Sequence, residues 1–282
     1  MIDPGQKIWS NGAIARATGQ HTMGVGFVAS GKPRVVDMKA LKVACQTCSL
    51  YELCLPLGLE NKDLDELDRI VKRQRPLQRG NYLFHVGDPF KSVYAIRTGS
   101  VKTYTCNDEG DEQVTGFHLP GELVGLDAIT SGRHPCAARA LETTSLCEIP
   151  FSRLEELSSH IPGLQRQLLR LMSREILEEQ NMMVWLGKKT AEQRLALLLL
   201  RIARNQHERH FSPYEFNLSM SRTDIGNYLG LAVETISRLF SRFQQDGILT
   251  VERKHVVIQD MDRLRQIAHP DDCPLDTGKV LC

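Results

Sequence analysis

A change of hydrophobic period near residue 162 divides this chain into parts that must fold differently. Between residues 77 and 149, short segments of alternating apolar and polar residues are separated by turn residues, at spacings near ten residues. Short strands at this spacing are typical of an antiparallel sandwich or barrel. From Pro162 to about Leu186 the apolar residues instead recur at steps of three and four, which predicts one long amphipathic helix.

The long helix has ends that fit its pattern, because Pro162 is tolerated in a first helical turn and Gly187 is common where a helix stops. Its apolar stripe is longer than one small domain would cover. The stripe packs either on its own barrel or, as we favour, along the seam of a parallel dimer of coiled-coil type. The predicted seam residues are Leu168, Met172, Ile176 and Glu179.

Two carboxylates lie beside this stripe. In a parallel dimer, Glu178 and Glu179 would meet their symmetry mates, and like charges at an interface oppose association. The alternative is that both lie on a solvated helix face. Under the dimer hypothesis, favourable positioning of the helix must outweigh this repulsion. A free-energy difference on the order of a few kcal/mol is enough to shift a two-state population decisively.

The region from residue 190 to about 259 is predicted to be mainly helical. Arg222–Leu229 and Val233–Phe240 read as two short helices that share a core and are joined by a tight turn. Gly226 is small where the two helices cross. Gly230 can take the positive φ that a sharp turn needs. The pattern therefore indicates a helix-turn-helix.

The second of these helices carries base-reading side chains on the face away from the core. They are Val233, Glu234, Ser237 and Arg238. Arg can donate twice to guanine, Glu can accept from the cytosine amino group, and a Val methyl can contact the thymine methyl. Residues 188–255 hold eleven Lys or Arg and seven Asp or Glu, a positive excess that suits phosphate contacts. Such helix pairs also occur in other all-α proteins, but the β-rich runs 247–251 and 255–258 resemble a wing and favour DNA binding.

Three cysteines stand close together in the spacing Cys-x2-Cys-x5-Cys, at Cys45, Cys48 and Cys54. The first thirty residues lack a secretory signal and no apolar run could span a bilayer, so we expect a cytoplasmic protein without a membrane partner. Clustered cytosolic thiols more often bind metal or sense redox state than form disulfides. Zinc or an iron–sulfur cluster would need a fourth ligand. Spacing leaves Cys106, Cys136 and Cys147 open for that role, whereas Cys273 and Cys282 read as free thiols of a tail.

Several segments resemble the FNR-type regulators of the CRP/FNR superfamily, over a stretch from about residue 45 to residue 258. The segments that carry the resemblance are Cys45–Leu57, Ser92–Arg97, Gly110–Leu119, Cys147–Pro150 and Asp224–Arg238. The resemblance implies an α+β fold. Its expected parts are an N-terminal antiparallel β-roll of the jelly-roll type seen in cyclic-nucleotide-binding domains, a long dimerisation helix and a C-terminal winged helix-turn-helix.

The resemblance also implies an oxygen sensor. It assigns a [4Fe–4S] cluster to Cys45, Cys48, Cys54 and Cys147, with Cys136 as the reserve fourth ligand and Cys106 less favoured. Without oxygen the intact cluster would favour a homodimer competent for DNA, and oxygen would convert it to a [2Fe–2S] form that favours the monomer. The implied partners are double-stranded DNA with an inverted repeat of the TTGAT type and RNA polymerase, in the control of genes for anaerobic metabolism.

The expected organisation follows from these parts. Hydrophobic residues make up 41% of the chain and charged residues 24%, an ordinary balance for two globular domains with tails. The predicted divisions are a flexible arm (1–40), the iron–sulfur sensor domain with its β-roll (41–160), the dimerisation helix (161–188), the winged helix-turn-helix domain (189–262) and a C-terminal tail (263–282).

Three other functions fit the sequence less well. A cyclic-nucleotide receptor of this superfamily needs an Arg-Ser pair before an Ala-rich strand, but here Arg133 is followed by His134 and Pro135, so no cyclic nucleotide is expected. A zinc-stabilised regulator would use the same cysteines and be colourless. An enzyme is not expected, because the chain has no phosphate-binding glycine loop, GxSxG or HExxH motif.

Overall fold

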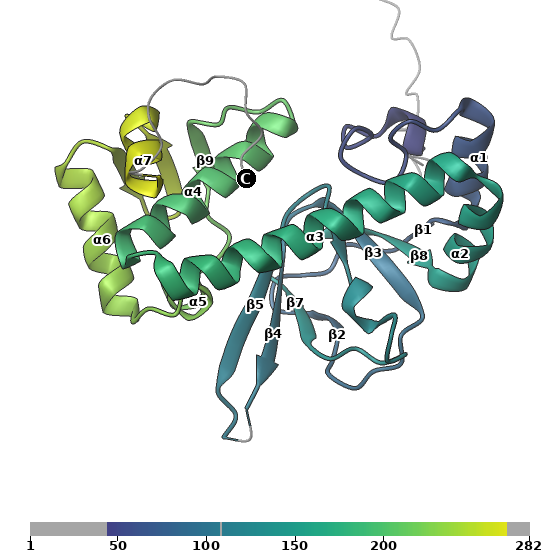
Figure 1. Cartoon of the computed structure of the whole chain (residues 1–282), viewed down its shortest axis with the longest axis horizontal. Coiled ribbons are helices and arrows are strands. Elements are labelled where there is room, and N and C mark those ends of the chain that lie inside the picture. Colours follow the sequence, from purple (N-terminus) through teal and green to yellow (C-terminus); the bar gives the residue numbers. More distant parts are fainter. Residues whose placement is uncertain (1–43, 108, 270–282) are drawn as a thin grey trace, which may run out of the picture. The chain divides into compact units, whose positions relative to one another are not determined.

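The computed structural model describes residues 44–107 and 109–269 (Figure 1). The predicted arm, the part of the predicted tail beyond residue 269, and the thiols Cys273 and Cys282 lie outside the described residues. Among the helices that are described, none is long and apolar enough to cross a membrane.

Within the described ranges, eight strands form two four-stranded antiparallel sheets, which we call the β-roll. The strand orders are β1-β8-β3-β6 and β2-β7-β4-β5. The strands are β1 (Lys72–Arg73), β2 (Tyr82–Phe84), β3 (Ser92–Thr98), β4 (Val101–Cys106), β5 (Glu112–His118), β6 (Leu123–Val124), β7 (Ala137–Ala140) and β8 (Ser145–Pro150). The antiparallel roll predicted from the alternating segments is therefore confirmed.

Two helices that the sequence analysis did not identify cover the first sheet of the β-roll: α1 (Asn61–Ile70) and α2 (Phe151–His160). A single apolar core joins them to the cysteine loop and to the sheet. Its members include Leu55 of the loop, Leu67 of α1, Ile149 of β8, Leu154 of α2 and Leu164 of the following helix. This core holds the cysteine loop against strand β8.

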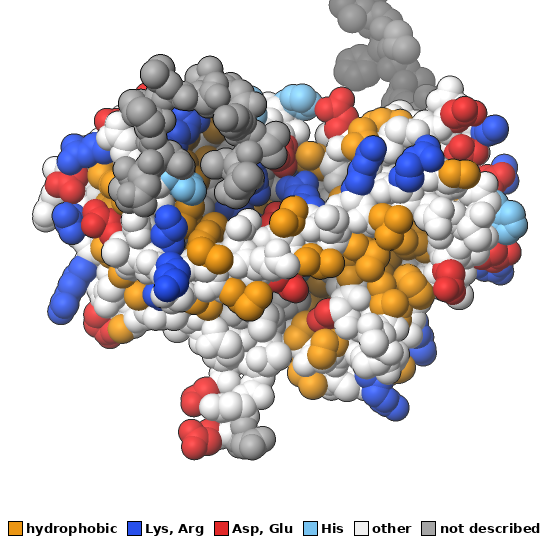
Figure 2. All heavy atoms as spheres, viewed as in Figure 1, with side chains coloured by type: hydrophobic (Ala, Val, Ile, Leu, Met, Phe, Trp, Pro, Cys, Tyr) orange, Lys and Arg blue, Asp and Glu red, His pale blue; other side chains and the backbone are white. Residues whose placement is uncertain are grey.

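Helix α3 (Pro162–Lys188) is the predicted long helix and has 27 residues. Its first turns pack on the β-roll, where Leu164 is fully buried and Leu168 lies at the edge of the core. Farther along, five apolar side chains are more than half exposed. They are Leu169, Ile176, Leu177, Met183 and Val184. Figure 2 shows hydrophobic side chains gathered along this helix.

The C-terminal part begins with α4 (Ala191–Glu208), which starts at a capping box between Thr190 and Gln193. The predicted helix pair is confirmed as α5 (Arg222–Leu229) and α6 (Val233–Gln245), with α6 longer than expected. Strands β10 (Leu249–Glu252) and β11 (His255–Ile258) form the predicted wing, and β9 (Glu215–Asn217) adds a third strand to it. Helix α7 (Met261–Ala268) packs on α4. Because α7 includes residue 262, the predicted domain boundary at that residue falls inside a helix.

The geometry of α5 and of the turn that follows it explains why glycine stands at positions 226 and 230. Gly230 has φ +64°, the left-handed conformation that was predicted. A Cβ on Gly226 would lie 2.6 Å from the backbone oxygen of Leu231 and 3.5 Å from Cγ1 of Ile236. The close neighbour of Gly226 is thus first the turn backbone and only second the crossing helix, which corrects the reason that the sequence suggested.

Candidate functional site

The four cysteines assigned by resemblance line one small pocket. Cys45 opens a short 3-10 helix (Cys45–Thr47), Cys48 and Cys54 lie in the turns that follow, and Cys147 lies on β8, about a hundred residues away in the sequence. The other walls of the pocket are largely apolar and include Leu50, Leu55, Leu67, Val71, Ala95 and Ile149. Three turn residues and one strand residue are therefore brought to the same place.

Polar contacts hold the cysteine loop to α1, β1 and α3. The backbone N–H of Cys45 donates to Oδ1 of Asp68 at 3.0 Å, and Asp68 also pairs with Arg73. The Arg73 guanidinium lies 3.8 Å from Sγ of Cys45. At the other end of the loop, Nε2 of Gln167 donates to the carbonyl oxygen of Cys54 at 3.1 Å.

Asp68, Arg73 and Gln167 were not predicted as parts of this site. A local pattern does not show that Asp68, Arg73 or Gln167 would approach a cysteine 23 to 113 residues away. A weak signal was available, because Gln167 is a polar residue on the apolar stripe of α3 and is 4% exposed. A buried polar side chain needs a hydrogen-bond partner, and here the partner is the loop.

Burial in the pocket favours the protonated form of Cys45, Cys54 and Cys147 by raising the pKa of each thiol. Burial raises the pKa of Cys45 to about 12, helped by the carboxylate of Asp68, and burial also raises the pKa of Cys54 to about 12. The pKa of Cys147 is raised by burial too, although Arg73 opposes the shift. Binding of a metal centre here would release protons, because the thiolate is the ligand. In the described part of the chain, no three His, Cys, Asp or Glu residues are gathered closely enough to hold one ion.

The two alternative fourth cysteines lie elsewhere. Cys136 is buried in a separate core of the β-roll, with Phe84 and Val124, and its thiol donates to Oδ2 of Asp127 at 3.2 Å. Cys106 is exposed at the end of β4. Neither residue lines the cysteine pocket, whereas Cys147 does. The geometry of the pocket therefore favours Cys147 as the fourth ligand.

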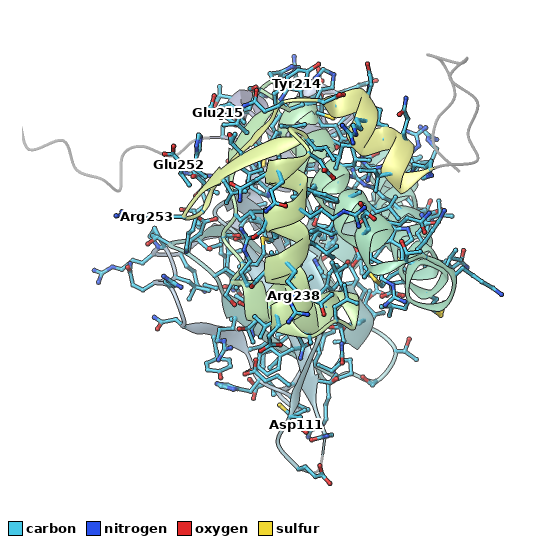
Figure 3. The ribbon with its side chains drawn as sticks, turned by 90° about the vertical axis from the view of Figure 1, so that its left-hand side faces the viewer. Asp111, Tyr214, Glu215, Arg238, Glu252 and Arg253 are labelled. Atoms are coloured by element: carbon cyan, nitrogen blue, oxygen red, sulfur yellow. The ribbon has the colours of Figure 1, made fainter. Side chains whose placement is uncertain are left out.

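The predicted base-reading residues form an exposed face of α6. Val233, Glu234, Ser237 and Arg238 are exposed, whereas Ile236 is fully buried in the shared core. The Ser237 hydroxyl donates to the Val233 carbonyl oxygen at 2.9 Å, so its lone pairs can still accept from a base, whereas donation to a base would require rotation. Figure 3 shows Arg238 on the outer face of α6, with Glu252 and Arg253 of the wing on the same side.

The prediction that Glu178 would repel its symmetry mate in a dimer is wrong. Glu178 does not face outward beside the apolar stripe, because one of its oxygens lies 2.8 Å from Nη2 of Arg201 on α4, and Arg174 and Arg204 also approach it. These arginines neutralise Glu178 within its own chain. Glu179 is exposed and stays a candidate for the dimer seam.

Known proteins match this chain over both parts. Residues 74–160 match the cyclic nucleotide-binding domain, and residues 193–267 match the Crp-like helix-turn-helix domain. The chain is 55% identical over 234 residues to the transcriptional activator protein anr of Pseudomonas aeruginosa, which covers 83% of this chain and 96% of that protein. It is 53% identical over 235 residues to the fumarate and nitrate reduction regulatory protein of Escherichia coli strain K12, covering 83% and 94%.

A solved structure supports the same relationship. FixK2 from Bradyrhizobium japonicum aligns with a TM-score of 0.64 and 32% identity, over 70% of this chain and 97% of that one. Regulators of this kind are not enzymes, in line with the absence of catalytic motifs from the sequence. The β-roll, the winged helix-turn-helix and these relatives together lead to one conclusion: the chain belongs to the CRP/FNR family, as a DNA-binding transcription regulator of the FNR type.

Proposed function

We propose that this regulator senses oxygen through a [4Fe–4S] cluster held by Cys45, Cys48, Cys54 and Cys147. The observation that carries the proposal is the convergence of these four thiols, from two distant stretches of chain, on one apolar pocket. The printed name of the Escherichia coli relative, which refers to fumarate and nitrate reduction, supports a role in anaerobic metabolism.

The pocket suits such a cluster chemically. Four thiolates are the usual ligands of a [4Fe–4S] core, which would supply an oxygen-reactive inorganic centre when bound. Because several iron atoms separate the ligands of a cluster, the sulfurs need a wider spacing than around a single zinc ion, whose Zn–S bonds are ~2.3 Å long. Arg73 adds positive charge beside Cys45, which favours thiolate.

The cysteine loop is connected to the predicted dimer seam through the start of α3. Gln167 donates to the carbonyl of Cys54, and a Cβ on Gly163 would lie only 3.1 Å from Cδ2 of Leu59. A rearranged loop would therefore shift the first turns of α3. We infer that two chains pair along the exposed part of this helix, with Met172, Ile176 and Glu179 in the seam and Leu168 at its edge.

In this dimer each α6 would read one half of an inverted repeat of the TTGAT type. Arg238 would donate to guanine, Glu234 would accept from cytosine, and Ser237 and Val233 would complete the contact. A two-fold dimer presents two such helices about one DNA turn apart. RNA polymerase is the further partner that this role in transcription requires.

A cyclic nucleotide is the weaker alternative. The residues before β7 are engaged within the β-roll, since Nη1 of Arg133 donates to the Gly87 carbonyl oxygen at 2.7 Å and His134 stacks on Phe84 at 3.6 Å. Cys136, which precedes the first alanine of β7, donates to Asp127. The side chains that would receive a cyclic phosphate are thus already partnered or stacked.

One preparation tests the cluster. The protein is purified without oxygen, its iron and acid-labile sulfide are assayed, its visible spectrum and its affinity for the inverted repeat are recorded, and air is then admitted. We expect a brown protein that bleaches, dissociates to monomers and loses DNA affinity. A colourless protein that holds one zinc ion and binds DNA equally well in air would refute the proposal.

A further inference from the structure

Helix α5 of the helix-turn-helix is attached to the β-roll by a buried ion pair. Lys102 on β4 is 3% exposed at its side chain, and its Nζ lies 2.7 Å from Oε2 of Glu112 on β5 and 2.8 Å from Oδ1 of Asp224 on α5. Arg139 on β7 lies 3.2 Å from the same oxygen of Glu112. Two cations and two carboxylates are therefore balanced at the contact between the β-roll and α5.

An asparagine of α5 occupies the free edge of the β-roll. Strand β5 is the edge strand of its sheet, so its outer backbone groups lack a neighbouring strand. The Asn227 side chain accepts from the Val114 N–H and donates to the Glu112 carbonyl, while Nε2 of Gln113 donates to the Asn227 carbonyl at 3.0 Å. Asn227 thus makes the hydrogen bonds that a residue of a further strand would make.

Apolar packing completes the contact. Phe117 of β5 and Tyr228 of α5 are both buried, with ring centroids 4.7 Å apart. They belong to one core that also contains Val114 of the β-roll together with Ile225 and Leu229 of α5. A contact that is buried, hydrogen-bonded and apolar opposes free movement of the two parts.

This contact leaves the reading face of α6 open. Polar contacts to the β-roll come from Asp224 and Asn227 of α5, from Arg201 and Asn205 of α4 and from Ser219. Glu234 and Arg238 on α6 remain exposed. Because α5 packs on α6 through the buried core, whatever fixes α5 also fixes α6. The attachment can therefore orient the recognition helix without covering it.

We propose that Lys102 and Asn227 are positioning residues for DNA binding, which dock α5 on strand β5 and so set the orientation of α6 relative to the β-roll. This inference rests on the proposed reading of an inverted repeat by two α6 helices. In a two-fold dimer the docking would set the separation of the two recognition helices, and so the spacing of half-sites that the protein accepts. Neither residue would contact DNA.

A first experiment tests docking without DNA. Hydrogen–deuterium exchange is followed in the peptides that cover β5, in wild type, Asn227→Ala and the matched control Asn217→Ala, an exposed asparagine of β9. Loss of the bond to the Val114 amide should speed its exchange about tenfold in Asn227→Ala alone. Equal exchange of this amide in all three proteins would show that α5 is not docked in solution, which overturns the inference.

A second experiment tests positioning. Affinities are measured for duplexes with identical half-sites, first at the separation that wild type binds most tightly, called the natural separation, and then at separations one and two base pairs longer. In Asn227→Ala and Lys102→Met, the ratio of the affinity at the natural separation to the affinity at the longer separations should fall several-fold. The preference for the correct base opposite Arg238 should not change. Lys91→Met, at an exposed lysine before β3, is the charge control and should behave as wild type.

Two further variants test the same contact between α5 and the β-roll. If Lys102→Met fails to fold, Asp224→Asn removes the ion pair while leaving a side-chain oxygen to accept from the N–H and the hydroxyl of Ser221 at the start of α5. The double variant with Asn227→Ala should show less than the sum of the single effects, because both residues hold one contact. Unchanged spacing preference in every variant contradicts the inference. Failure of wild type to recognise any inverted repeat would instead refute the proposed function, and the exchange result would still decide whether α5 is docked.

Discussion

Cys147 and Arg238 show how single residues depend on their surroundings. Cys147 is one of three cysteines of the β-roll, and it alone of the three shares a pocket with the cysteine loop. Arg238 is one of many arginines, but it lies on the exposed face of α6, where its guanidinium has no hydrogen bond or ion pair to another residue that the structure describes. In both cases the position of the residue distinguishes it from others of its type.

Replacing Cys147 tests the proposed set of cluster ligands. We expect Cys147→Ser to lose most of the bound iron and the oxygen-responsive DNA binding, because a serine oxygen replaces thiolate poorly. Cys136→Ser should keep both, since Cys136 is bonded to Asp127 outside the pocket. Iron content and anaerobic DNA affinity are the measurements, and equal losses in the two variants would mean that the fourth ligand is misassigned.

Replacing Arg238 tests base reading. Arg238→Ala should weaken binding to the inverted repeat by ~1 to 3 kcal/mol for each half-site contact, because a bidentate contact to guanine is lost. Binding to random duplex should change little. Competition titrations at fixed salt measure both affinities, and an equal loss on random duplex would place Arg238 on a phosphate.

Helix α3 is the element that connects the cysteine loop to the exposed apolar stripe. Its first turns are buried against the β-roll and contact the cysteine loop, while its middle carries apolar side chains that are more than half exposed. An exposed apolar stripe of this length is typical of a helix that pairs with another chain. Glu178 no longer opposes such pairing, since arginines of its own chain neutralise it.

A charge placed in the stripe should prevent pairing. Ile176→Glu would bring two carboxylates together in a parallel dimer, so we expect a monomer under anaerobic conditions and DNA affinity reduced at least tenfold. Ser152→Glu, at an exposed position of α2, adds the same charge outside the stripe and should leave the dimer intact. Sedimentation velocity without oxygen distinguishes the two results, and a dimeric Ile176→Glu protein would place the seam on another surface.

At the scale of the whole molecule, a network of charges joins the β-roll to α3 and α4, with Glu122 and Arg201 as its least exposed members. It contains Glu122, Arg174, Glu178, Arg201, Arg204 and Glu208. Glu175 lies beside it, facing Glu122, Glu178 and Arg201. Burial, reinforced by the neighbouring carboxylates, raises the pKa of Glu175 from 4.5 to about 8. The folded protein therefore keeps a proton on Glu175 that the unfolded chain releases.

This proton makes stability depend on pH. Below pH 4.5 Glu175 is protonated in both states, and as pH rises from 4.5 to about 8 the unfolded chain is favoured increasingly. Glu175→Gln stays neutral, so it should be more stable than wild type by about 2 kcal/mol at pH 8, a value reduced for partial exposure to water. At pH 4 the two should be equal. Urea unfolding at both pH values tests this, and a variant that is less stable at pH 8 would show that Glu175 is ionised and paired.

Much of this protein was predictable from short stretches of sequence. The strand pattern, the 27-residue helix, the helix-turn-helix and the wing all follow from hydrophobic periods and turn residues that act over a few positions. Helices α1 and α2 were missed although Leu64 and Leu67 are spaced as on one helix face, because ten residues carry too few apolar repeats to stand out. The three clustered cysteines were equally evident from their spacing.

Only the tertiary structure decided which distant residues meet. Strand pairing places Cys147 opposite Arg73 and Ala95 and so brings its thiol to the cysteine loop, a result that no local pattern contains. The same holds for Glu178, whose partners come from α4, and for Lys102 and Asn227, which join β4 and β5 to α5. Local sequence determines the period and the ends of an element, whereas its neighbours are selected by how all the elements together bury their apolar faces and pair their charges.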